Sequence, residues 1–168
     1  KAGVARRLVS VNKKYGEKNK ISFAILGGHG EPDSMEFGHS IEKDQDKYKL
    51  VSHTLSKYDL GANSPKGLRG RFTKKDPKGA TITELKTWFI DKPSIVLVAC
   101  STGADAGIGN EIYEMGADVI APRFPAHLDR LAAGKRTNGT LWFSVRFIDP
   151  DDEYKPEEIY RHFRQKVA

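Results

Sequence analysis

Ile21-Ser-Phe-Ala-Ile-Leu-Gly-Gly-His29-Gly30 is one of two segments that decide the fold, and Ser94-Ile-Val-Leu-Val-Ala-Cys100-Ser-Thr-Gly103 is the other. Each is an apolar run of strand length that ends in a reactive side chain beside glycine. Two neighbouring strands of a parallel sheet would bring the imidazole of His29 and the only thiol, that of Cys100, to one edge. An imidazole and a thiol at one edge are the two side chains that a cysteine hydrolase needs as base and nucleophile.

Length and composition indicate a single globular domain. The chain has 168 residues, of which 38% are hydrophobic and 30% charged, and no stretch approaches the ~20 apolar residues of a membrane span. The single cysteine excludes an internal disulfide and a cysteine-rich zinc site. No signal peptide is visible, which favours the cytoplasm, and a chain that starts at Lys1 is expected to be a trimmed piece of a larger protein.

The net charge of +6 comes with basic clusters at 6–7, 13–14, 66–71 and 74–75. Solvated surface accounts for such clusters, and an anionic partner such as nucleic acid or another polyanion is the alternative. No motif with aromatic residues between the basic ones supports a nucleic-acid partner.

Hydrophobic periodicity and turn residues predict the elements. Helices are expected over 2–19, 81–90, 104–115 and 157–167, and strands over 21–26, 95–99, 119–121 and 141–148. Loops are expected over 31–38, 58–79 and 122–140, the last with a helical turn at 127–133, and a polar exposed segment over 41–49; segment 50–57 is ambiguous. This order predicts an α/β sheet with helical cover and ligands at the carboxyl ends of its strands.

The chemistry of Cys100 requires help from its surroundings. A free thiol is about 1–2 pH units too weak an acid to be mostly thiolate at neutral pH. His29 is the candidate base, and a helix that begins just after Cys100 would direct its amino-terminal dipole at the sulfur. Because Gly30 has no side chain to block a substrate, the backbone amides of Gly30 and Cys100 are the candidate oxyanion hole.

A different nucleophile geometry fits the sequence less well. A hydrolase elbow around Cys100 needs a small residue where Val98 stands, and it would take His127 or His162 as its base.

Metal and phosphate sites are also weakly supported. His29, His39 and His53 have spacings that match no compact set of metal ligands, and the glycines around His29 lack both the spacing of a dinucleotide loop and the lysine of a P-loop. We therefore expect no metal and no cofactor.

The two decisive segments together resemble the signature of the caspase-like cysteine peptidases, a clan that includes caspases, metacaspases, legumains, clostripain, gingipains, separase and the CHAT-domain proteases. In that clan an apolar strand ends in His-Gly and a later one ends in Ala-Cys-x-x-Gly, the order in which His29-Gly30 and Ala99-Cys100-Ser-Thr-Gly103 occur here. The separation of 71 positions exceeds the ~50 of caspases, and the loop 58–79 would absorb the difference. Gly116-Ala-Asp-Val-Ile-Ala121 resembles the next strand in CHAT and clostripain-like members.

The resemblance covers residues 20–125, and it implies a caspase-like fold with a mostly parallel sheet and helices on both faces, in a single peptidase domain over 1–168. It implies that His29 is the general base, that Cys100 is the nucleophile, and that the amides of Gly30 and Cys100 bind the oxyanion. The clan has two strands before the histidine strand, whereas only a helix is expected here, so the first strands of the sheet are expected to be missing.

Four residues are candidates for substrate binding. Many clan members cleave after Arg or Lys by means of a buried carboxylate, and Asp33 and Asp105 each follow a catalytic motif closely. A loop or helix-cap carboxylate is the simpler interpretation of both. Trp142 and Ser144 lie on the late strand that would wall the substrate groove, with core packing as the alternative for Trp142.

The sequence thus predicts a cysteine endopeptidase with a preference for a basic residue before the scissile bond. The expected partners are a protein or peptide substrate and an activating partner, domain or autocleavage event, as in a zymogen, acting on the lysine-rich loop 65–79. No membrane partner is expected. The alternatives are a caspase-like binding or scaffold module without activity, and a non-peptidase cysteine hydrolase or amidotransferase.

Overall fold

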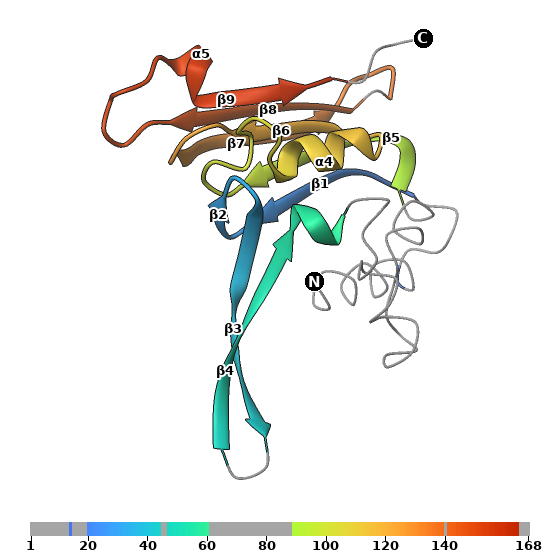
Figure 1. The fold of residues 1–168 in the computed structure, drawn as a ribbon. Helices are drawn as coiled ribbons and strands as arrows, with labels where there is room; N and C mark the ends of the chain where they lie inside the picture. The colour runs from blue at the N-terminus through green and yellow to red at the C-terminus, as the bar shows by residue number, and fades with distance from the viewer. Residues whose placement is uncertain (1–13, 15–19, 45–46, 61–88, 140, 165–168) are drawn as a thin grey trace.

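The central sheet has four strands in the order β1-β5-β6-β9 (Figure 1). The computed structural model describes residues 14, 20–44, 47–60, 89–139 and 141–164. The strands of this sheet are β1 (Ile21–Gly27), β5 (Phe89–Val98), β6 (Asp118–Pro122) and β9 (Tyr160–Phe163). β1, β5 and β6 run parallel, and β9 runs antiparallel to β6. The expected α/β class is confirmed in its coarse form, as a mixed sheet that includes parallel strands.

Strand β5 is the centre of this sheet because both of its faces are buried. Ile95, Leu97 and Ala99 belong to one hydrophobic cluster, and Val96 and Val98 belong to another on the opposite face. A parallel strand covered on both faces is expected to be a nearly continuous apolar run, which explains why the sequence signal was strong.

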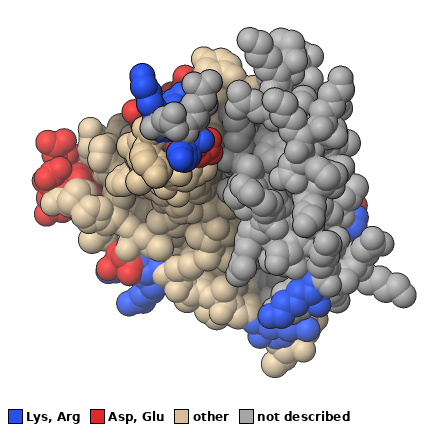
Figure 2. Space-filling model, turned by 90° about the horizontal axis from the view of Figure 1, so that it is seen from below, with Lys and Arg blue, Asp and Glu red and all other residues tan. Residues whose placement is uncertain are grey.

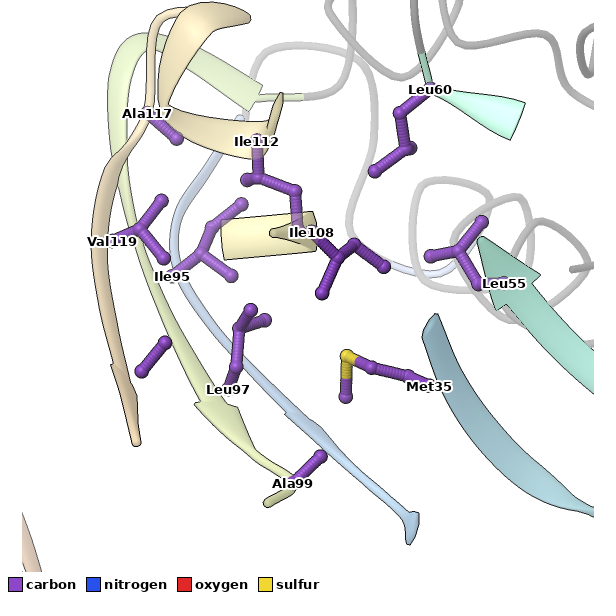
Figure 3. Packing of buried hydrophobic residues seen from close by; sticks show 11 residues of the cluster. Met35, Leu55, Leu60, Ile95, Leu97, Ala99, Ile108, Ile112, Ala117 and Val119 are labelled. Carbon is purple, nitrogen blue, oxygen red and sulfur yellow. The ribbon is translucent and has the colours of Figure 1, made fainter. Parts of the chain in front are cut away.

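One face of the sheet packs against helix α4 (Ile108–Glu114) and against the residues that follow β1. Ile108 and Ile112 of the helix meet Leu97 and Val119 of the sheet, and Met35 closes the cluster near its lower end (Figure 3). Burying an aliphatic side chain of this size contributes about 1.5–3 kcal/mol. This cluster therefore holds the segment after His29 firmly against the sheet.

The other face carries a hairpin where helical cover was expected. β7 (His127–Lys135) and β8 (Leu141–Ile148) pair with each other antiparallel, and α5 (Pro156–Ile159) lies beside them. Phe147 and Ile159 are buried against Val96 and Ile120 of the sheet. Helical cover on this face is limited to the four residues of α5, and the alternation of Phe143, Val145 and Phe147 places one face of β8 on the sheet.

A second antiparallel sheet follows β1 directly. It has the order β2-β3-β4, with β2 (His29–Glu31), β3 (Ser34–Asp44) and β4 (Lys47–Ser56), and the short helix η1 (Lys57–Asp59) comes next. The far part of β3 and β4 projects from the rest of the described molecule as an arm (Figure 1). The loop expected over 31–38 is corrected to strand residues of β2 and β3, joined at Pro32-Asp33 by a turn that suits proline. Residues 41–43 and 47–49 of the expected polar segment are exposed, as expected, and lie in β3 and β4.

Three expected helices are also corrected. Helix α4 begins only at Ile108, because Ser101 and Ala106 adopt positive φ angles of 58° and 52° that interrupt a helix. The expected helical turn at 127–133 lies within β7, and of the helix expected at 157–167 only residues 157–159 are helical, in α5, while Tyr160–Phe163 form β9. Phe89 and Ile90 belong to β5 rather than to a helix.

The expected strands over 21–26, 95–99, 119–121 and 141–148 are confirmed as strand segments, although the last belongs to the outer hairpin. The expected helix 2–19, the loop 61–79 and the helix start at 81–88 lie outside the described residues. Within the described ranges, no helix is both long and apolar enough to span a bilayer.

Candidate functional site

The two decisive segments leave the sheet side by side at its carboxyl edge. The parallel register pairs Gly27 with Val98, the last residue of β5, and the amide of Gly28 donates a hydrogen bond to the carbonyl of Val98 at 3.1 Å. His29 and Cys100 each follow within two residues of this last contact. The expectation that both strands end at one edge is confirmed by this register.

Two glycines allow the chain around His29 to approach its neighbours closely. A Cβ on Gly30 would lie 2.4 Å from the carbonyl oxygen and 2.6 Å from the amide nitrogen of Cys100, and one on Gly28 would lie 2.2 Å from the carbonyl oxygen of Glu36. Such distances are closed to any side chain, so glycine is required at both positions. Because consecutive Cα atoms are about 3.8 Å apart, the Cα atom of His29 lies within roughly 8 Å of the Cys100 carbonyl oxygen.

Cys100 is half-buried. Its Sγ lies 4.0 Å from the carbonyl oxygen of Ala126, at the limit of a weak S–H···O contact. The side chain of His29 is exposed, and no hydrogen bond joins it to Cys100 in the described part of the chain. The structure thus brings the two backbones together and leaves both side chains accessible from solvent.

The loop after Cys100 is fixed by its own hydrogen bonds. Thr102 is fully buried and its hydroxyl donates to the carbonyl of Ala99 at 2.7 Å. The amide of Gly103 donates to Pro122 at 2.6 Å, and a Cβ on Gly103 would lie 2.3 Å from the carbonyl oxygen of Ala121. The Thr-Gly pair of the cysteine motif therefore has a structural role, which is to hold this loop against β6.

Helix α4 does not supply the dipole that the sequence predicted for the sulfur. The helix begins at Ile108 rather than directly after Cys100, and the amide of Ile108 donates to the carbonyl of Pro32 at 2.8 Å. The helix amino terminus is thereby directed at the β2–β3 turn. The expected dipole contribution to Cys100 is corrected accordingly.

The two candidate oxyanion donors lie next to each other. A Cβ on Gly30 would lie 2.6 Å from the amide nitrogen of Cys100, so the two residues are in direct backbone contact. Among the described residues, no backbone carbonyl accepts from the Cys100 amide.

A second histidine lies near the thiol, and sequence reasoning considered it only for a different geometry. His127 is exposed and follows Ala126, the residue whose carbonyl faces the Cys100 sulfur. This proximity was not predicted, because the segment was expected to be an irregular loop with a helical turn, whereas His127 begins strand β7.

Asp33 and Asp105 are both engaged in ion pairs near this edge. Lys57 Nζ lies 2.7 Å from Asp33 Oδ1 and donates to the carbonyl of Ala106 at 3.1 Å. The hydrogen bond to Asp33 raises the pKa of Lys57. Arg161 pairs with Asp105. These contacts tie the β2–β3 turn and β9 to the loop before α4, in agreement with the simpler interpretation of both carboxylates.

Trp142 and Ser144 lie away from the candidate site. They pair with Gly134 and Ala132 on β7, and they alternate with the residues of β8 that pack on the sheet, so they occupy the outer face of the hairpin. Trp142 is opposite Gly134, and Gly134 lies seven residues, or about 23 Å, from His127 along β7. The structure therefore gives no support to these two residues as walls of a groove at Cys100.

No group of three or more His, Cys, Asp and Glu side chains that could hold a metal ion occurs within the described ranges. The basic clusters at 66–71 and 74–75 fall outside those ranges. Within them, acidic side chains outnumber lysines and arginines, so the anionic partner considered from the sequence depends on segments not described.

Comparisons of this chain with protein-family models, with curated proteins and with solved structures find no match.

Proposed function

We propose that this protein is a cysteine endopeptidase of caspase-like fold that acts through Cys100 and His29. The observation that supports this most is the backbone contact between Gly30, the residue after His29, and the peptide of Cys100 at the carboxyl edge of a parallel strand pair. Open sheets with parallel strands bind ligands at such an edge. Cys100 is half-buried rather than enclosed in the core, as a nucleophile that meets a substrate carbonyl has to be.

The proposed reaction has two halves. The Cys100 sulfur attacks the scissile carbonyl carbon while its proton passes to His29, and the carbonyl oxygen takes up the negative charge between the amides of Gly30 and Cys100. The carbon–nitrogen bond breaks as His29 protonates the leaving amine. Water, deprotonated by His29, then attacks the thioester and releases the acid and the free thiol. The residues involved require no metal.

Some features of the fold support the caspase-like part of the proposal, and one feature departs from the caspase-like pattern. The histidine strand precedes the cysteine strand, the two are parallel neighbours, and β6 follows in parallel as the resemblance implies. The hairpin of β7 and β8 on one face, where helices were expected, is a departure from that pattern.

The preference for a basic residue and the activation event also remain proposals. Asp33 and Asp105 would have to recognise the basic side chain, and both already pair with cations of the chain, Lys57 and Arg161. A peptide-library cleavage profile tests the preference. Limited proteolysis with and without a candidate activator tests the activation.

The decisive experiment is labelling by a peptide with a thiol-reactive electrophile, combined with cleavage of a peptide library. Wild type is expected to be labelled rapidly at Cys100 and to cleave peptides, while Cys100→Ala does neither. His29→Ala is expected to retain the thiol and lose both rapid labelling and cleavage, typically by a factor of ~10²–10⁴.

His127→Ala is the matched control, because it removes the other exposed histidine beside the thiol. Near-normal cleavage in this variant supports His29 as the base, whereas a loss in His127→Ala alone transfers that role. Slow labelling of a folded wild type without cleavage of any peptide would favour a scaffold module. Release of a small amide or ester product without peptide cleavage would favour a non-peptidase hydrolase.

A further inference from the structure

The arm formed by β3 and β4 has one face whose residues are fixed by the register. Ile41 is directly opposite Leu50, and Lys43 is directly opposite Tyr48. Toward the base, the same face continues through the pair of His39 and Ser52 and the pair of Glu36 and Thr54. One extra residue in β3, with Gly38 at a φ of 105°, keeps both pairs on this face. We call this row of paired residues the outer face of the arm.

Toward the tip, the outer face carries three strongly exposed apolar side chains, with Lys43 opposite one of them. Ile41, Leu50 and Tyr48 are 72%, 64% and 76% exposed, which makes them the three most exposed of the large hydrophobic residues in the described part of the chain, apart from Tyr58. On the reverse face, Glu42 is directly opposite Lys49. An arm with one apolar and one charged face is typical of a surface that binds an apolar partner.

Within the part of the chain that the structure describes, the backbone of β3 also has an unpaired edge. Strand β2 pairs with β3 only at Ser34, Met35 and Glu36, so from His39 onward β4 is its one partner among the described residues. Unpaired amides and carbonyls on an edge strand are a template for an added strand. Seen from below, the middle of the described surface consists mainly of residues other than Lys, Arg, Asp and Glu, and in places near its margin acidic and basic side chains lie next to one another (Figure 2).

His29 is the first residue of β2, and its partner Glu36 is the last residue of β3 that pairs with β2. The unpaired edge of β3 therefore begins beside His29. His29 is directly opposite Glu36, which is directly opposite Thr54. Glu36 Oε1 accepts a hydrogen bond from Ser52 Oγ at 2.8 Å and lies 2.7 Å from His39 Nε2. A strand added to β3 beyond this polar group would continue the line of β2 and point at the candidate site. At about 3.3 Å per residue, the row of Leu50 lies ~13 Å and that of Tyr48 ~20 Å from the row of His29.

We propose that the free edge of β3 and the outer face of the arm bind an extended segment of the polypeptide substrate, with apolar side chains at alternate positions. The segment adds a strand to β3, packs its apolar side chains on Ile41, Leu50 and Tyr48, and leads the chain to Cys100 about four to six residues away. This inference rests on the proposed peptidase function. It adds a recognition surface outside the catalytic edge.

Binding is measured with the full chain carrying Cys100→Ala, which holds a peptide without cleaving it. The probe is a fluorescein-labelled peptide of about twelve residues with valine at alternate positions, followed by fluorescence anisotropy. Adding Tyr48→Ser and Leu50→Ser is expected to weaken binding by a factor of ten or more, as loss of central apolar anchors does. Lys49→Ser, on the reverse face, is the matched control and is expected to leave binding unchanged.

Two further probes test the mode of binding. A peptide with serine in place of valine is expected to bind at least tenfold more weakly, and so is the valine peptide with alternate backbone amides methylated, because methylation removes the strand hydrogen bonds. Equal binding by all three peptides, or by the arm variants and the control, overturns the inference. Thermal melts of each variant establish that a loss of binding is not a loss of fold.

The same reagents separate this inference from the proposed function. If Cys100→Ala binds the peptide through the arm and the wild type cleaves nothing, the peptidase proposal fails and the binding surface stands. If the wild type cleaves short and long apolar peptides equally well, with or without the arm substitutions, the binding surface fails and the peptidase stands. A concentration-dependent dimer that Leu50→Ser abolishes would assign the face to a second copy and overturn the inference.

Discussion

Replacing Gly30 with alanine adds one methyl group at the point where β2 crosses the end of β5. The new Cβ would lie 2.4 Å from the carbonyl oxygen of Cys100 and 2.6 Å from the carbonyl carbon of Ala99. All the opposing atoms belong to backbone, so no side chain can rotate away. The segment carrying His29 has to retreat by roughly 1 Å before the contact becomes ordinary, and overpacking of this kind costs about 1–3 kcal/mol.

Gly27→Ala is the matched control three residues earlier. The nearest atoms to its Cβ are 3.8 Å away, in ordinary contact, and Gly→Ala at a compatible position stabilises by about 0.4–1 kcal/mol. The two variants should therefore differ by about 2–3 kcal/mol in the free energy of unfolding. With a urea m-value of about 1–3 kcal/mol/M, their unfolding midpoints should differ by about 1 M or more.

The same pair of variants links the fold to the site. Without urea, Gly30→Ala is expected to be folded. Its Cys100 should nevertheless be labelled more slowly by a peptide electrophile than the wild-type residue, because the added methyl group moves His29 away. Gly27→Ala should keep the wild-type rate. Equal midpoints and equal labelling rates for the two variants would refute the close approach of β2 to Cys100.

Three other changes test separate parts of the structure. Thr102→Val should lower the free energy of unfolding by about 1–3 kcal/mol in urea titrations, because the carbonyl of Ala99 loses its buried donor, while Thr102→Ser should lower it less. Phe147→Ala should cost about 3–5 kcal/mol in the same assay if β8 covers the sheet, and a cost below 1 kcal/mol would contradict that packing. Burial, and next the charge of Arg164, lower the pKa of His162. The unfolded chain therefore binds more protons, so stability should fall as pH decreases through about 6.5 toward the lowered value, and His162→Gln should flatten this slope between pH 7.5 and 5.

The sequence predicted best the second half of β5, where both faces of the strand are buried. Ile95–Val98 is a continuous apolar run that ends at the cysteine motif, and the half-buried β1 is mostly apolar and is followed by glycine. The arm was missed because its strands carry lysines and glutamate between single apolar residues, so they looked like a solvated segment. Alternating apolar and polar residues are a weak indication of a strand when the apolar side chains are exposed rather than packed in a core.

The candidate site shows the same division. The prediction that His29 and Cys100 lie at one edge of the sheet followed from the two parallel strands that precede them. The position of His127 near Cys100 depends on the start of β7, for which the sequence had no clear signal. The ion pairs of Asp33 and Asp105 join residues far apart in the chain, Lys57 and Arg161, and no local pattern predicts such partners. Sequence reasoning therefore located the reactive groups and missed the contacts that surround them.

The central claim is that the imidazole of His29, in β2, accepts the proton of the Cys100 thiol, which follows β5. The rate of Cys100 alkylation by iodoacetamide at pH 7 tests this claim most directly. Wild type should react much faster than His29→Ala, and His127→Ala should react like wild type. A rate that is the same with and without His29, in variants shown by thermal melts to be folded, would contradict the claim that the two side chains exchange a proton.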